Sequence, residues 1–82
     1  MSNVILSKKA EDNFAKLPTN QKNKVNKKLF SLTSDPYSGK KLKGEYAEYY
    51  SLKAWPYRII YFIMRNGNIW VTSILHRQGA YK

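Results

Sequence analysis

From residue 57 to residue 75 the chain reads YRIIYFIMRNGNIWVTSIL. Two nearly continuous apolar runs, residues 57–64 and 69–75, flank Asn66-Gly67, and this dipeptide is a strong signal for a tight hairpin turn. Short apolar runs rich in β-branched and aromatic residues are typical of strands buried at the centre of a sheet. The stretch therefore predicts a central antiparallel hairpin.

Upstream of this hairpin, β-forming residues fill positions 46–53 and predict another strand, which a turn at Ala54-Trp55-Pro56 joins to the hairpin. A short apolar run at residues 3–6 predicts a first strand, which joins the sheet at an edge or between two other strands. Turn-forming residues fill positions 35–39, and residues 40–44 then form a compact basic loop.

Residues 7–33 carry the periodicity of helices. Ser7 is a good N-cap, and apolar residues follow at spacings of four and three, at Ala10, Phe14 and Leu17. Pro18 ends this helix, and Thr19 is the expected cap of a second helix over residues 20–33. The second helix has lysines on its outer face and an apolar stripe made of Val25, Leu29 and Leu32, with Phe30 beside it.

The predicted order is β-α-α-β-β-β, in a single domain spanning residues 1–82. Consecutive strands joined by short turns form an antiparallel sheet, and the helix pair covers one of its faces. This is a two-layer α+β fold. The second face has no helix left to cover it, so we expect it to be open for a ligand.

Charge dominates the composition. Fifteen Lys and Arg against five Asp and Glu give a net charge of +10, which attracts polyanions and favours nucleic acid as the partner, ahead of an acidic protein or an anionic membrane. The chain has no cysteine and one histidine, which argues against a metal or thiolate site, and we expect no cofactor. No window resembles a signal peptide or membrane span, so we expect a cytoplasmic protein without a membrane partner.

The alternation of strand residues sorts the candidate site residues. With Leu52 facing the core, Tyr49, Ser51 and Lys53 fall on the open face, and Arg58 joins them there because Tyr57, Ile59 and Tyr61 face the helices. Arg58 binds an anion or pairs with Glu45 or Glu48 as a structural ion pair. His76 and Arg77 end the last strand, where a rigid scaffold presents side chains to a ligand. His76 is a candidate proton-transfer group or a hydrogen-bonded structural histidine.

These residue types suit RNA cleavage without a metal. When a 2′-hydroxyl attacks its own 3′-phosphate, negative charge builds on oxygens that the guanidinium groups of Arg58 and Arg77 can bind. Tyr81 or Tyr49 can stack on a base. Backbone phosphates suit the lysines on the outer face of the second helix, namely Lys22, Lys24, Lys27 and Lys28, and those of the basic loop. The RNA-binding candidates of the loop and the C-terminus are Lys40, Lys41, Lys43 and Lys82.

Five motifs together resemble the RelE/ParE toxin superfamily. They are Pro36-x-x-Gly39-Lys40-Lys41-Leu42-Lys43-Gly44, Tyr50-x-Leu52, Tyr57-Arg58-Ile59-Ile60-Tyr61, Ile74-Leu75-His76-Arg77 and Tyr81. The resemblance covers nearly the whole chain and implies a toxin of a type II toxin–antitoxin pair. RelE-like members cut mRNA in the ribosomal A site, leaving a 2′,3′-cyclic phosphate and a 5′-hydroxyl.

The resemblance also implies roles and partners. The family's phosphate-binding arginines fall on Arg58 and Arg77, and its C-terminal tyrosine falls on Tyr81. The implied partners are an acidic antitoxin, mRNA and rRNA, with operon DNA contacted only through the antitoxin.

One departure concerns the general base. The best-known members carry two lysines where this chain has Tyr49 and Ser51, so Lys53, His76 and Tyr49 remain candidates for the base. Two other functions stay open: a ParE-like inhibitor of DNA gyrase without nuclease activity, and a non-catalytic module that binds RNA or the ribosome. The combination of Arg58, Arg77 and Tyr81 favours the nuclease.

Overall fold

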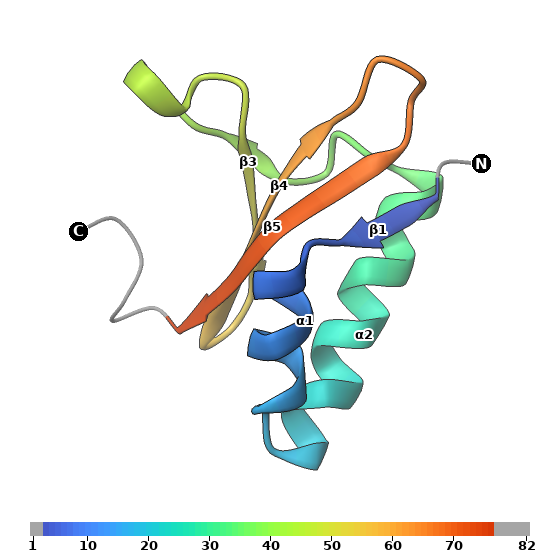
Figure 1. Cartoon of the computed structure of the whole chain (residues 1–82), viewed down its shortest axis with the longest axis vertical. Coiled ribbons are helices and arrows are strands. Elements are labelled where there is room, and N and C mark those ends of the chain that lie inside the picture. The colour runs from blue at the N-terminus through green and yellow to red at the C-terminus, as the bar shows by residue number, and fades with distance from the viewer. Residues whose placement is uncertain (1–2, 77–82) are drawn as a thin grey trace.

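Five strands form one mixed sheet in the computed structural model, which describes residues 3–76 apart from the side chain of Tyr46. Across the sheet the strands follow the order β1-β5-β4-β3-β2. Figure 1 shows the two longer helices side by side next to the sheet. In chain order the elements are β1 (Val4–Leu6), α1 (Lys8–Ala15), α2 (Thr19–Ser34), β2 (Lys40–Lys41), η1 (Gly44–Tyr46), β3 (Tyr50–Ala54), β4 (Tyr57–Ile63) and β5 (Ile69–His76).

The hairpin of β4 and β5 lies at the centre of the sheet, as the sequence predicts. The Gly67 N–H donates to the Met64 carbonyl at 2.8 Å, and the Met64 N–H donates to the Asn68 carbonyl at 2.7 Å. Gly67 has a φ of +91°, a conformation that glycine adopts without the steric cost that a Cβ would bring. The Asn-Gly turn therefore closes the hairpin that carries the rest of the sheet.

The first strand corrects the expectation of a fully antiparallel sheet. β1 lies at one edge and pairs in parallel with β5, with Val4 opposite Ile69 and Leu6 opposite Val71. Parallel pairing requires a long crossover connection, and the chain between these two strands supplies one through its helices. The predicted order of helices and strands is otherwise confirmed, with one short strand added.

That added strand is β2, which occupies part of the segment expected to be a basic loop. Lys40 and Lys41 pair with Ser51 and Tyr50. The strand expected over residues 46–53 is shorter than predicted, because residues 44–46 form the 3-10 helix η1 and pairing begins only at Tyr50. The chain reverses its direction between β2 and β3, and residues 46–49, which the sequence assigned to a strand, belong to this connection instead.

The two helices have different N-caps. Ser7 caps α1 as predicted, since its Oγ accepts from the Ala10 N–H at 3.1 Å. Thr19 does not cap α2; it is the first helical residue, and Pro18 takes the cap position without a side-chain hydrogen bond. Neither helix in the described part of the chain is long and apolar enough to cross a lipid bilayer.

The core lies between the helix pair and one face of the sheet. Val25 and Leu32 of α2 are fully buried, and so are Ile59 and Tyr61 of β4. Phe30 lies outside this stripe and is 69% exposed on the outer side of α2. The alternation in β4 is therefore the one expected, with Ile59 and Tyr61 toward the helices and Arg58 away from them.

A β-bulge in β5 changes which of its side chains face the helices. Ile60 pairs with Ser73, but the next residue, Tyr61, pairs with Val71, so Thr72 is the extra residue. Side chains of the first helical segment bind the backbone here: Ser7 Oγ donates to the Thr72 carbonyl at 2.8 Å, and the Ile74 N–H donates to Asn13 Oδ1 at 3.0 Å. The bulge allows both Val71 and Ile74, three residues apart, to be buried in the core.

Candidate functional site

The register of β3, β4 and β5 arranges side chains of the open face in rows across the strands. Lys53 lies opposite Arg58, and Arg58 lies opposite Leu75; we call Lys53 and Arg58 the cationic row. Next along the strands comes a middle row of Ser51, Ile60 and Ser73. These rows lie on the face of the sheet opposite to the described helices, as the sequence predicts for Ser51, Lys53 and Arg58.

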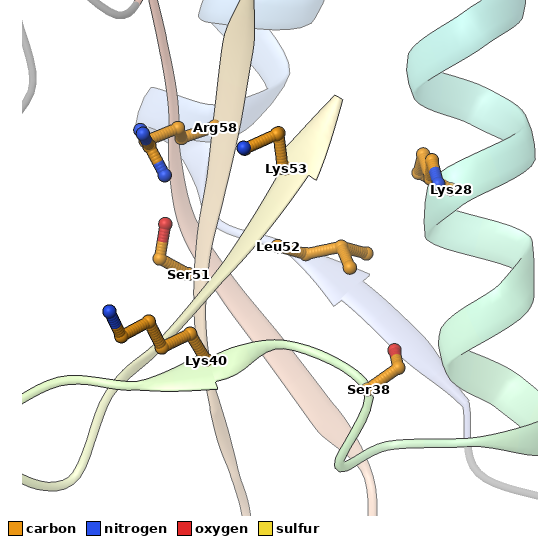
Figure 2. A pocket seen from close by; sticks show the side chains of 7 residues that line it. All are labelled: Lys28, Ser38, Lys40, Ser51, Leu52, Lys53 and Arg58. Atoms are coloured by element: carbon orange, nitrogen blue, oxygen red, sulfur yellow. The ribbon is translucent and has the colours of Figure 1, made fainter. Parts of the chain in front are cut away.

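A pocket of about 410 Å³ lies at the cationic row and extends around the edge of β3. Figure 2 shows Lys40, Ser51 and Arg58 on one side of the β3 ribbon, with the Lys53 amino group directed toward Arg58. Among residues 3–76, the side chains that line the pocket include four cations and no carboxylate: Lys28, Ser38, Lys40, Ser51, Leu52, Lys53 and Arg58. Like charges gathered at one concave site raise the local potential and favour a bound anion.

Ser51 lies among these cations with an unsatisfied hydroxyl. The residue is only 4% exposed, and its Oγ has no hydrogen-bond partner among the described residues. A buried hydroxyl without a partner costs free energy, so such a group is often completed by a ligand or water. Its Oγ points to the same side of β3 as the head groups of Arg58 and Lys40 (Figure 2), which makes an anion's oxygen a suitable partner.

The register bears on the alternative that Arg58 forms an ion pair with Glu45 or Glu48. Arg58 lies opposite Lys53, near the end of β3. Glu45 belongs to η1, and Glu48 precedes the start of β3 by two residues. Both glutamates are exposed and lie before the opposite end of this strand. The register therefore separates both glutamates along β3 from the position opposite Arg58.

Tyr61 anchors the loop that brings Lys40 to the pocket. Its hydroxyl donates to the Pro36 carbonyl at 2.8 Å and accepts from the Gly39 N–H at 3.0 Å. A Cβ at residue 39 would lie 2.6 Å from this hydroxyl, so the close approach requires glycine. The Tyr61 ring also stacks on Tyr50 with centroids 5.3 Å apart. These contacts hold the loop before β2 against β4, the strand that also carries Arg58.

We expect Tyr61→Phe to lower the free energy of unfolding by about 1–3 kcal/mol, because the Pro36 carbonyl and the Gly39 N–H lose their shared partner. Urea denaturation of the purified protein measures this change. Tyr37→Phe is the matched control, since Tyr37 is 67% exposed and should lose almost nothing. Equal losses in the two variants would show that the anchor contributes no stability.

The Tyr61 hydroxyl should also make the stability of the fold depend on pH. Burial raises the pKa of Tyr61 above its usual value of 10.0, the Gly39 N–H lowers it in part, and negative charge on Tyr50 or Asp35 raises it. The folded state then holds this proton more tightly than the unfolded state, so the contribution is complete below about pH 10 and is lost as the pH rises further. Urea midpoints measured across that range should fall less steeply for Tyr61→Phe than for the wild type.

The other candidate residues do not all meet at the pocket. Lys41 and Lys43 are exposed and lie outside its lining. Tyr49 lies opposite Phe62, toward the other end of the sheet, with ring centroids 5.7 Å apart. The remaining candidates at the C-terminus lie outside the described residues: Arg77, Tyr81 and Lys82.

His76 lies on the helix-facing side of the sheet rather than beside Arg58. It pairs with Tyr57, and the two rings meet edge to face with centroids 5.4 Å apart. Leu75, the residue opposite Arg58, takes the open face instead. The bulge at Thr72 produces this arrangement, and it removes the geometric basis for His76 as the general base.

Sequence reasoning missed two lining residues, Lys28 and Ser38. Lys28 was expected on the outer face of α2, among lysines that track phosphates, and periodicity alone does not show that this flank of the helix borders the β3 edge. Ser38 belongs to a turn, where no strand or helix pattern exists. Among residues 3–76 there is no cluster of three or more side chains suited to a metal ion.

Comparisons with known proteins identify the family and the fold of this chain. The sequence model of the ParE toxin of type II toxin–antitoxin systems, parDE, matches residues 4–81. No curated protein sequence matches the chain. A chain of the Mycobacterium tuberculosis toxin–antitoxin complex RelBE2 is 26% identical, with a TM-score of 0.85 over 93% of this chain and 98% of that one.

Two further solved structures share the fold at lower identity. A chain of the archaeal RelE–RelB complex from Pyrococcus horikoshii is 20% identical, with a TM-score of 0.80 over 96% of this chain and 98% of that one. The isolated E. coli RelE toxin is 21% identical, with a TM-score of 0.78 over 93% and 84%. The family match spans nearly the whole sequence, and these folds agree with it. The chain therefore belongs to the ParE toxin family of type II toxin–antitoxin systems, within the RelE/ParE superfamily.

Proposed function

We propose that this toxin is a metal-independent endoribonuclease that cuts mRNA on the ribosome. The observation that carries the proposal is the gathering of Arg58, Lys53 and Lys40 around the unsatisfied Ser51 hydroxyl on the open face. This arrangement suits a phosphodiester, because the cations bind its non-bridging oxygens while the hydroxyl donates to one of them.

The proposed reaction follows from that arrangement. The 2′-hydroxyl of the substrate loses its proton to a base, its oxygen attacks the adjacent phosphorus, and the bond to the 5′-oxygen breaks. The departing 5′-oxygen takes up a proton from water, which leaves a 2′,3′-cyclic phosphate and a 5′-hydroxyl. Negative charge grows on the non-bridging oxygens during the attack, and a guanidinium held at Arg58 stabilises it. Arg77 would add a second guanidinium and Tyr81 would orient the substrate or move a proton; both lie outside the described residues.

Lys53 is our candidate for the group that accepts the 2′-hydroxyl proton. It shares the cationic row with Arg58, whereas Tyr49 lies in another row and His76 lies on the opposite face. Its side chain is exposed and directed toward Arg58 (Figure 2), so it can reach a phosphate's neighbouring hydroxyl. Position therefore favours Lys53 over His76 and Tyr49, the other two candidates that the sequence leaves open.

We expect Lys53→Ala to lower cleavage by about 10²- to 10⁴-fold, the usual range for loss of a general base. Lys53→Arg should be equally impaired, because a guanidinium keeps the charge but stays protonated and cannot accept a proton. Initial rates of cutting on programmed ribosomes measure both variants. An active Lys53→Arg enzyme would show that Lys53 acts through its charge and would exclude it as the base.

The partners of the proposed function follow from charge. A net charge of +10 favours approach to the rRNA and mRNA of the A site, and it also favours an acidic antitoxin that neutralises the toxin. The M. tuberculosis and P. horikoshii relatives are toxin–antitoxin complexes, which supports a cognate antitoxin here. Operon DNA would then be contacted only through that antitoxin.

The deciding experiment is induction of the toxin without its partner, followed by mapping of mRNA 5′ ends with and without a translation blocker. Cuts that disappear with the blocker are the expected result. The ParE-like alternative is inhibition of DNA gyrase, so plasmid supercoiling is measured in the same cells. Altered supercoiling without cuts would overturn the nuclease in favour of a gyrase inhibitor. Absence of both effects would leave a non-catalytic binding module.

A further inference from the structure

Three aromatic side chains form another row on the open face, two residues farther along β4 than the middle row. Phe62 lies opposite Trp70 in β5. On its other side is Tyr49, since the pairing of Tyr50 with Tyr61 brings the preceding residue next to Phe62. The Tyr49 and Phe62 rings meet edge to face, at an interplanar angle of 89°. We call Tyr49, Phe62 and Trp70 the aromatic row.

The bulge in β5 allows this row to share a face with the cationic row. Counting by two from Trp70 along a regular strand leads to Thr72 and Ile74, and Ile74 is buried in the core. The extra residue Thr72 shifts the alternation, so Trp70, Ser73 and Leu75 all face away from the helices. The Thr72 hydroxyl donates to the Ile60 carbonyl at 3.1 Å and fixes the bulge in place.

The aromatic row keeps part of its surface accessible. All three residues are half-buried, and no helix of the described chain covers this face of the sheet. Between the aromatic and cationic rows lie the short side chains of Ser51 and Ser73, which flank Ile60. The open face therefore has an apolar, aromatic end and a cationic end, separated by a low middle row.

We propose that the aromatic row is a nucleobase platform that stacks a base of the same RNA strand whose phosphate is bound at the cationic row. This inference rests on the proposed RNA substrate and adds a recognition site to it. Phe62 lies four positions after Arg58 in β4, which places the rows about 13 Å apart along the strand. A nucleobase lies closer than this to its own phosphate, so the stacked base belongs to a neighbouring nucleotide.

Charge complementarity favours RNA over an apolar partner on this face. A helix or a second copy of the chain that covered the aromatic row would extend over Lys53 and Arg58, and burying those cations without anions is costly. A single strand of RNA can bind both rows, because its bases stack on aromatic rings and its phosphates pair with cations. The aromatic end and the cationic end of the open face therefore suit one ligand that carries both bases and phosphates.

The chain contains two tryptophans, which allows a direct test. Trp55 is 50% exposed in the turn between β3 and β4, outside the aromatic row, so Trp55→Phe leaves Trp70 as the only fluorescent indole. The probe is a short single-stranded oligoribonucleotide with 2′-O-methyl groups, which 2′-hydroxyl attack cannot cleave. We expect saturable quenching of Trp70. Making one nucleotide abasic at a single position should abolish the quenching.

Affinities of variants for a dye-labelled copy of this oligonucleotide sharpen the test. Phe62→Leu and Trp70→Leu should each weaken binding by about 5- to 150-fold, the range expected for losing one stacked base. Trp70→Phe keeps a ring and should stay close to wild type. Phe30→Leu is the matched control, since this exposed aromatic lies on α2, away from the sheet face.

The outcomes separate this inference from the proposed nuclease. Binding that depends on Arg58 and on salt, but tolerates abasic nucleotides at every position and leaves Trp70 unquenched, would overturn the platform while the phosphate site stands. A change in Trp70 emission with protein concentration alone would instead identify the row as a contact between copies and overturn the proposal. Base-dependent quenching by a toxin that cuts no mRNA would support the platform and refute only the nuclease.

Discussion

Replacing Arg58 with alanine should reduce mRNA cleavage by about 10²- to 10³-fold, the usual cost of removing one donor that stabilises charge in a transition state. Arg58 lines the pocket together with Lys40 and Lys53, and it faces the same side as the unsatisfied Ser51 hydroxyl. Arg58→Lys should restore only a small part of the activity, because an ammonium cannot form the two parallel hydrogen bonds of a guanidinium. Single-turnover rates on programmed ribosomes measure the effect without interference from product release.

Arg65 provides the matched control for this experiment. Arg65→Ala removes the same side chain and the same charge, but Arg65 is exposed and begins the turn that follows β4, at the far end of the strand from Arg58. We expect cleavage by Arg65→Ala to stay within about twofold of wild type, since only long-range attraction is weakened there. Similar losses in both arginine variants would mean that total charge, rather than a phosphate site, governs activity.

The face of the sheet on which Arg58 lies is the part of the site that sequence reasoning could predict. The run from Tyr57 to Ile63 is almost continuously apolar, and Arg58 is its one charged residue, so the face that carries Arg58 was expected to lie away from the helices. Tyr61 and Ile59 are indeed fully buried. Ser51 and Lys53 followed from the same alternation in the neighbouring strand. Local patterning was sufficient because every one of these residues lies in a regular stretch of strand.

The features that sequence reasoning missed arise from irregular or long-range structure. Lys40 and Lys41 carry no strand signal, yet they pair with β3 directly after the loop that the Tyr61 hydroxyl holds against the sheet. The bulge at Thr72 is hidden in a continuous apolar run, although it decides that His76 faces away from Arg58. Tertiary contacts, rather than local composition, determine both features.

The proposed site requires that the Arg58 face of β4 points away from the helices, and two adjacent isoleucines test this directly. Ile59 is fully buried, while Ile60 is half-buried in the middle row of the open face. We expect Ile59→Ala to lower the free energy of unfolding by about 2–5 kcal/mol, from lost burial and the cavity left behind. For Ile60→Ala we expect about 1 kcal/mol, because that side chain is only partly buried and lies outside the core between the sheet and the helices.

The expected loss for Ile59→Ala is large relative to the total stability of a domain of this size. At about 0.05–0.15 kcal/mol per residue, 82 residues have a total stability of roughly 4–12 kcal/mol, so Ile59→Ala removes a substantial share of it. Urea denaturation of the two variants, followed by circular dichroism, compares the same chemical change at neighbouring positions of one strand. A larger loss for Ile60→Ala would mean that β4 is inverted, and Arg58 would then point into the core instead of toward a phosphate.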